Sequence, residues 1–126
     1  MIFKFNPLSG LIIIPVRFWG PKGDAIIQMA LDTGASQTLI NWDIAILLGY
    51  DPAAVRKRVK IATASGLEFA PKMTVTKIQA LGVVKNNFSL LCHTLPQSTN
   101  VEGLLGLDFF RNTVLKLDFI KGHIHL

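Results

Sequence analysis

The chain is built around Leu31-Asp32-Thr33-Gly34-Ala35-Ser36, which ends an apolar run that begins at Ile26. The run predicts a buried β-strand that stops at a carboxylate. Burying a carboxylate is costly unless it accepts hydrogen bonds or shares a proton. Gly34 lets the backbone turn tightly and present N–H groups to Asp32. Because Asp, Thr and Gly are all common turn residues, an ordinary turn is the better interpretation of this stretch on its own.

Two later stretches change that interpretation. Small residues at Ala64-Ser65-Gly66 separate two short β-type segments, which predicts a hairpin with a flexible tip. About seventy residues after Asp32, the apolar pair of Leu104-Leu105-Gly106 runs into a glycine, and residues 107–111 have the spacing of a short helix. Asp108 is expected to cap that helix or to join an ion pair between subunits.

Together the three stretches resemble the catalytic motif, the flap and the later apolar segment of retropepsin-like aspartic proteases. The resemblance runs from about Gly10 to Leu126, and its C-terminal part is more similar to cellular and bacterial members than to viral ones. Viral members usually carry Arg-Asn where this chain has Leu107-Asp108. The resemblance implies an all-β acid-protease barrel with one or two short helices, which is a single domain over residues 1–126 and active as a C2 homodimer.

The implied enzyme is an aspartic endopeptidase that acts on an extended peptide or protein substrate. In a homodimer, Asp32 and its symmetry mate share one proton and activate a water molecule, and no metal or cofactor is needed. Thr33 would bond to the other subunit's loop, and Gly34 would give the carboxylates access to backbone N–H groups. The flap over the substrate would consist of Thr63, Ala64, Ser65 and Gly66. The loop that backs the active site would consist of Leu104, Leu105 and Gly106.

Ala35 stands where some relatives carry a hydroxyl residue, so the carboxylate has one hydrogen-bond donor fewer. This predicts a higher pH optimum than pepsin-like enzymes show, because a carboxylate with fewer donors is less stabilised when charged. The alternative function is a catalytically silent peptide-binding or dimerisation module of the same fold. The intact Asp32-Thr33-Gly34 favours the enzyme, since a silent module has no physical need for a buried acid pair.

The rest of the pattern predicts mostly β-structure. Turn residues separate the predicted strands, which cover residues 10–18, 24–32, 37–40, 60–63, 67–69, 73–78, 88–93, 114–119 and 123–126. Asn41 is a reasonable N-cap for a helix that ends at Gly49, and Asn86-Asn87 predicts a turn. The N-terminal arm, residues 1–9, is expected either to pair with the terminus of a partner chain or to be loose.

Composition and charge limit the classes of partner. Half of the 126 residues are hydrophobic, which excludes a disordered chain and suggests a surface reserved for a partner. The net charge of +5 is partly local, since Arg56, Lys57, Arg58 and Lys60 lie close together. No aromatic platform or nucleic-acid motif accompanies them, so a solvated turn or helix end is expected and no nucleic-acid partner. No apolar run is long enough to span a membrane.

The cysteine and the histidines have structural interpretations. Cys92 is the single cysteine, which excludes an intrachain disulfide and favours the cytoplasm. A buried thiol is expected, because a nucleophile needs a base and the adjacent His93 points to the opposite face of the strand. His123 and His125 have the spacing of two metal ligands, but no third ligand is evident and no metal site is expected. Asp118 is expected to be a strand-edge acid.

Overall fold

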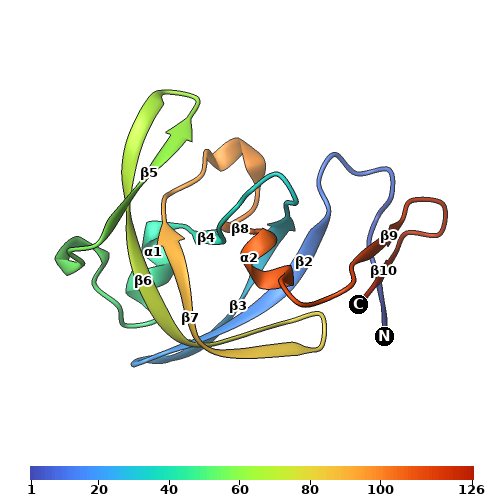
Figure 1. Cartoon of the computed structure of the whole chain (residues 1–126), viewed down its shortest axis with the longest axis horizontal. Coiled ribbons are helices and arrows are strands. Elements are labelled where there is room, and N and C mark those ends of the chain that lie inside the picture. Colours follow the sequence, from blue (N-terminus) through green and yellow to red (C-terminus); the bar gives the residue numbers. More distant parts are fainter.

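The strands of the computed structural model, which describes residues 1–126, form two sheets (Figure 1). The larger sheet has the strand order β2-β3-β8-β4-β7-β6-β5, and β2 also pairs with β6. All of its strands except β5 therefore close into a six-stranded barrel. The strands of this sheet are β2 (Ile13–Gly20), β3 (Gly23–Leu31), β4 (Leu39–Ile40), β5 (Arg58–Thr63), β6 (Gly66–Ala80), β7 (Val83–Cys92) and β8 (Gly103–Leu105).

The core forms because apolar residues alternate along the barrel strands. In β2, the side chains of Ile14, Val16 and Phe18 are buried and their neighbours are exposed or half-buried. Two short helices, α1 (Trp42–Leu47) and α2 (Leu107–Phe110), add apolar side chains to the same cluster. The chain also contains two 3₁₀ turns, η1 (Pro52–Ala54) and η2 (Gln97–Thr99). The predicted β-barrel with short helices is confirmed.

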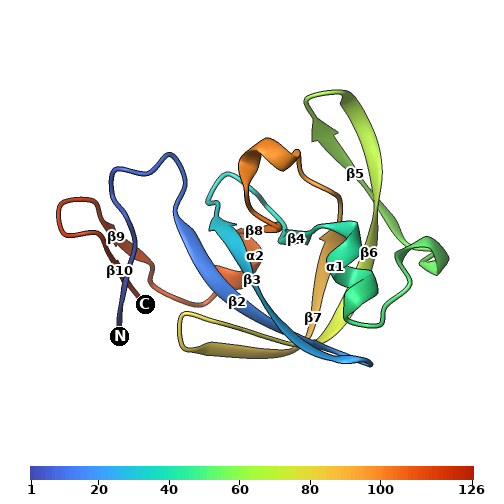
Figure 2. The same cartoon turned by 180° about the vertical axis from the view of Figure 1, so that it is seen from behind.

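The β5–β6 hairpin extends away from the barrel, at the upper left of Figure 1 and the upper right of Figure 2. β5 pairs with β6 only, from Arg58↔Pro71 to Thr63↔Gly66. The turn lies at the expected place, and Gly66 has a φ of +118°, which favours glycine. The two separate strands expected at 67–69 and 73–78 are wrong, because β6 is continuous. Pro71 is tolerated since it lies where β6 leaves β5, and pairing with β7 begins at the next residue.

The turn expected at Asn86-Asn87 is also wrong. β6 and β7 are joined by Leu81-Gly82, whose φ angles of 52° and 74° are those of a tight hairpin turn. Asn87 lies inside β7 with a left-handed φ of 51°. Opposite Asn87, the N–H of Thr76 donates to Tyr50 Oη (2.8 Å), so a side chain outside the sheet takes one ladder hydrogen bond.

The smaller sheet joins the two termini, which lie side by side in Figures 1 and 2. It has the order β1-β10-β9, with β1 (Ile2–Lys4), β9 (Lys116–Asp118) and β10 (His123–His125). The N-terminal arm was expected to pair with a partner chain or to be loose, and the structure corrects this. Ile2 is the register partner of His125 in the same chain, and Phe5 packs edge-on against Phe119. The arm is held because both its backbone and its aromatic side chain find partners within the chain.

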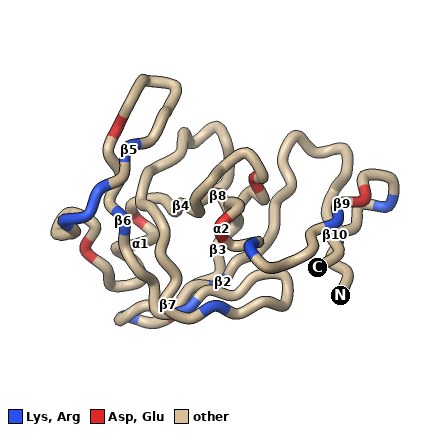
Figure 3. The backbone as a smooth tube through the Cα atoms, viewed as in Figure 1, with Lys and Arg blue, Asp and Glu red and all other residues tan.

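A group of basic residues lies where the chain enters β5, seen in blue at the left of Figure 3. Arg56, Lys57 and Arg58 are all exposed there, as expected of a solvated turn. No helix of the chain is both long enough and apolar enough to span a membrane.

Candidate active site

Asp32 directly follows β3 and lies on the floor of a cleft. Its N–H donates to the carbonyl of Leu105 (2.9 Å), which extends the parallel pairing of β3 with β8 by one residue. The N–H of Gly34 donates to Asp32 Oδ1 (2.9 Å). A Cβ at position 34 would lie 3.1 Å from that oxygen, so glycine allows this close approach. Asp32 is half-buried and not sealed in the core, so its carboxylate faces the cleft.

The loop after Asp32 is held from behind by the segment that ends β8. The N–H of Leu107 donates to the carbonyl of Ala35 (2.8 Å), and the N–H of Gly106 donates to Thr38 Oγ1 (3.1 Å). A Cβ at Gly106 would lie 2.7 Å from the Ala35 carbonyl oxygen, so no side chain fits between the two segments. Leu105 and Gly106 are buried. The geometry therefore brings Leu104-Leu105-Gly106 directly against the loop that carries Asp32.

Asp108 fixes the other end of this loop. Its carboxylate accepts hydrogen bonds from the N–H of Thr38 (2.9 and 3.0 Å to the two oxygens) and from Thr38 Oγ1 (2.6 Å). Thr38 is the one fully buried polar residue of the chain. The hydroxyl of Thr38 links two segments, because it donates to Asp108 and accepts from the N–H of Gly106. Asp108 therefore bonds to Thr38 and does not cap the helix, and the ion pair between subunits stays a prediction.

The cleft lies between the barrel and the β5–β6 hairpin and has a volume of about 830 Å³. Its floor includes Asp32, Leu39, Leu91 and Leu104, which lie on adjacent strands in the sheet order β3-β8-β4-β7. The inner side of the hairpin supplies the opposite wall. The residues of the hairpin that line the cleft are Val59, Lys60, Ile61, Ala62, Thr63, Ala64, Ser65 and Glu68. An open trough of mixed apolar and polar lining, with one carboxylate on its floor, suits an extended peptide.

The site residues predicted from the sequence mostly meet in this cleft. Asp32, Gly34, Ala35 and Leu104 line its floor, and Thr63, Ala64 and Ser65 line the hairpin wall. Four predicted residues lie outside the lining: Thr33 beside Asp32, Gly66 beyond the hairpin turn, and Leu105 and Gly106 behind the loop. Thr33 is exposed, and its hydroxyl makes no hydrogen bond within the chain.

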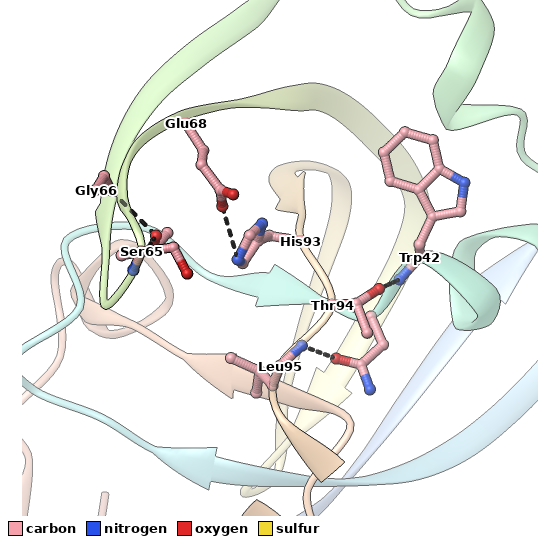
Figure 4. Close-up of polar contacts among 9 residues, drawn as sticks. Trp42, Ser65, Gly66, Glu68, His93, Thr94 and Leu95 are labelled. Atoms are coloured by element: carbon pink, nitrogen blue, oxygen red, sulfur yellow. Dashed lines mark hydrogen bonds and ion pairs between the residues drawn. The ribbon is translucent and has the colours of Figure 1, made fainter.

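One charged pair crosses the cleft away from Asp32. His93 Nε2 lies 3.5 Å from Glu68 Oε2, so a residue at the end of β7 meets one on the hairpin (Figure 4). Both side chains are only partly covered, with exposed fractions of 29% and 45%. Asp32 is thus the one acid of the cleft without a basic partner.

The other chemistry-bearing residues have structural surroundings. Burial raises the pKa of the Cys92 thiol to about 12, and Cys92 Sγ lies 3.0 Å from Met73 Sδ. Hydrogen bonds from the N–H groups of Lys121 and Ile120 lower the pKa of Asp118, which lies at the end of β9. The rings of His123 and His125 lie 5.9 Å apart between centroids. No group of three or more His, Cys, Asp or Glu side chains is placed to hold a metal ion.

Residues 22–112 match the family model described as gag-polyprotein putative aspartyl protease. The chain belongs to this family. The match includes the Asp32 loop, the β5–β6 hairpin and the Leu104-Leu105-Gly106 segment, so the three stretches predicted from the sequence all lie inside it.

The fold also matches that of a solved structure. The crystal structure of a retropepsin-like aspartic protease from Rickettsia conorii is similar with a TM-score of 0.73 and 23% sequence identity. The similarity covers 100% of this chain and 97% of the rickettsial one. At this identity it shows the fold alone, and it confirms the predicted retropepsin-like barrel. No curated protein sequence is significantly similar to the chain.

Two contacts of this aspartyl protease domain were not predicted from the sequence. The bond from Thr38 to Asp108 joins residues 70 positions apart, which no local pattern reveals. The pair of Glu68 and His93 had a partial signal, because Glu68 alternates with apolar residues on a hairpin strand. Its partner, His93, follows β7, and the sequence pattern does not place the end of β7 beside the hairpin.

Proposed function

We propose that two copies of this chain form an aspartic endopeptidase with one active site on their shared axis. The observation that carries the proposal is the place of Asp32, on the floor of the cleft, with the nitrogen of Gly34 2.9 Å from its carboxylate. One chain offers one such acid, whereas attack of water on a peptide carbonyl uses a base and an acid together. A C2 dimer supplies the second acid as Asp32 of the partner subunit.

The two carboxylates then share one proton, because like charges in contact do not both ionise. The charged carboxylate takes a proton from water as the oxygen attacks the scissile carbonyl carbon. The protonated one donates a hydrogen bond to the carbonyl oxygen and stabilises the tetrahedral intermediate. Proton transfer to the peptide nitrogen then breaks the C–N bond. The β5–β6 hairpin acts as the flap that covers the substrate and excludes water.

Features of the surface support a partner chain. Ile120 and Leu8 have exposed fractions of 95% and 93%, and Phe119 has 59%. Two of these belong to the loop of the smaller sheet, at the end of the molecule where both termini lie. Covering such apolar side chains favours association. The exposed Thr33 beside Asp32 is free to bond to the loop of the second subunit.

The test combines association with cleavage. Sedimentation velocity at micromolar concentration measures the oligomeric state, and an apolar peptide library across pH measures endopeptidase activity. We expect a dimer, cleavage that pepstatin-type inhibitors block, and loss of cleavage in Asp32→Asn. The matched control is Asp43→Asn, which changes an exposed acid outside the cleft and leaves activity intact. A monomer without cleavage at any pH would favour the silent peptide-binding or dimerisation module instead.

The pH–rate profile tests the role proposed for Ala35. With a methyl group at this position, the carboxylate pair lacks a hydroxyl donor, and the charged form is less stabilised. We expect an optimum above that of pepsin-like enzymes. A profile that peaks below about pH 3.5 contradicts this reasoning.

A further inference from the structure

The β5–β6 hairpin is tied to the rest of the chain by one polar contact. From Val59 to Ala70, its backbone hydrogen bonds stay within the hairpin. Its side-chain hydrogen bonds also stay within the hairpin, since Thr63 Oγ1 donates to the carbonyl of Gly66 and accepts from the N–H of Ser65. Glu68 Oε2 alone reaches out, to His93 Nε2 at 3.5 Å. An isolated two-stranded hairpin is only marginally stable, so a single contact with the barrel has a large effect on where the hairpin lies.

His93 belongs to a segment that is fixed to the barrel. The N–H of His93 donates to the carbonyl of Ile40 (3.0 Å), which continues the pairing of β7 with β4. The next two residues are held at the start of α1. Trp42 N–H donates to Thr94 Oγ1 (3.1 Å), and Leu95 N–H donates to Asn41 Oδ1 (2.9 Å), as Figure 4 shows. Glu68 therefore joins a projecting ribbon to a rigid wall of the cleft.

The pair lies too far from Asp32 to take part in the bond-breaking step. His93 follows β7, and Asp32 follows β3. In the order β3-β8-β4-β7, these strands are three spacings apart, which is roughly 14 Å across the sheet. Both ends of this distance border the same cleft, so the pair acts on the space that a substrate occupies.

We propose that Glu68 and His93 are positioning residues that hold the hairpin closed over the cleft as an ionic strap. This rests on the proposed function in so far as the hairpin is the flap of a peptidase. With the strap formed, the apolar inner face at Val59 and Ile61 stays over the floor, and a bound peptide is enclosed. With the strap broken, the ribbon has no polar tie to the barrel.

The strap joins two partly exposed side chains, so dissolved salt is expected to weaken it. Neither partner has a competing ion pair in the chain. The other charged side chains on the elements around it are Lys72 on β6, Lys60 on β5, Asp43 on α1, Glu102 before β8 and Asp32 on the floor. Lys60 also lines the cleft.

A fluorophore on Ser65→Cys in the full-length chain reports the strap without any need for activity. The native Cys92 stays unlabelled because it is buried and its pKa is about 12. Quenching by neutral acrylamide measures how open the hairpin turn is. We expect less quenching in the wild type than in Glu68→Gln or His93→Gln at the same pH and low salt. High salt is expected to raise quenching in the wild type but not in the single variants, and the exchanged pair Glu68→His with His93→Glu is expected to restore the wild-type value.

Activity gives the second readout. At about pH 5.5, loss of one exposed ion pair is expected to raise KM about two- to five-fold and to leave kcat nearly unchanged. The matched control is Glu102→Gln, an exposed acid outside the cleft lining. Equal quenching in the wild type and both single variants overturns the strap, as does failure of the exchanged pair to restore the wild-type value. Absence of cleavage together with the expected difference in quenching overturns the peptidase and keeps the strap.

Discussion

Removal of the Asp108 carboxylate is expected to cost much of the stability of this domain. In Asp108→Ala, Thr38 loses the acceptor of both its N–H and its hydroxyl, and Thr38 is fully buried. An unmade bond to a charged acceptor costs about 1.5–3 kcal/mol, so the two donors together lose about 3–5 kcal/mol of the free energy of unfolding after some relaxation. For a chain of 126 residues this corresponds to a fall in Tm of about 10–20 °C.

Urea unfolding of the wild type and the variant at one protein concentration measures this loss, since association shifts apparent stability. Asp108→Asn keeps one acceptor oxygen and is expected to lose about half as much. Glu102→Ala removes an exposed acid whose side chain makes no hydrogen bond or ion pair. Its free energy of unfolding is expected to stay within about 0.5 kcal/mol of the wild-type value.

A double-mutant cycle with Thr38→Val tests the assignment to this contact. The coupling free energy between the two positions is expected to exceed about 1 kcal/mol, because both changes remove the same bond. A loss below about 1 kcal/mol in Asp108→Ala, or additive effects in the cycle, would refute the reasoning.

Three further predictions concern other parts of the chain. Gly106→Ala places a Cβ 2.7 Å from a backbone oxygen and is expected to lose about 1–3 kcal/mol of the free energy of unfolding, measured by thermal unfolding. Gly10→Ala serves as the neutral control, because nothing lies within 4 Å of a Cβ at Gly10. Burial raises the pKa of Cys92 from 9.0 to about 12, so the folded state keeps a proton that the unfolded chain releases, and stability from this group is present below pH 9 and lost as pH rises toward 12. Urea titrations above pH 9 are expected to show a steeper loss for wild type than for Cys92→Ala, and parallel curves would contradict the assignment. Tyr50→Phe removes the oxygen that accepts the N–H of Thr76 (2.8 Å) and is expected to cost about 1–2 kcal/mol and to speed exchange of that amide, which an unchanged exchange rate would disprove.

The sequence was sufficient where the information is local. The apolar run into Asp32 predicted where that strand ends, and the small residues of Ala64-Ser65-Gly66 predicted the hairpin turn. Each of these features follows from the conformational preferences of a few neighbouring residues. The order of three such stretches then indicated the family, which the match over residues 22–112 shows.

The same local rules failed where a distant partner outweighs local preference. Asn86-Asn87 has turn residues, yet pairing of β7 with β6 keeps it in a strand, and Tyr50 takes the hydrogen bond that is missing opposite it. The N-terminal arm has no signal of its own, and β10 gives β1 its pairing partner. Both outcomes depend on chain segments that meet only after folding.

The loop of Asp32 shows the division most clearly. Asp-Thr-Gly after an apolar strand predicted a tight turn that presents N–H groups to the carboxylate, and the resemblance to the protease family implied its catalytic role. Only the tertiary structure showed that Asp108 holds the far end of this loop, because it bonds to Thr38, 70 positions away in the sequence. It also showed that His93 contacts Glu68 across the cleft. Hydrogen bonds and ion pairs between remote residues depend on the register of the sheet, and a list of residues does not contain that register.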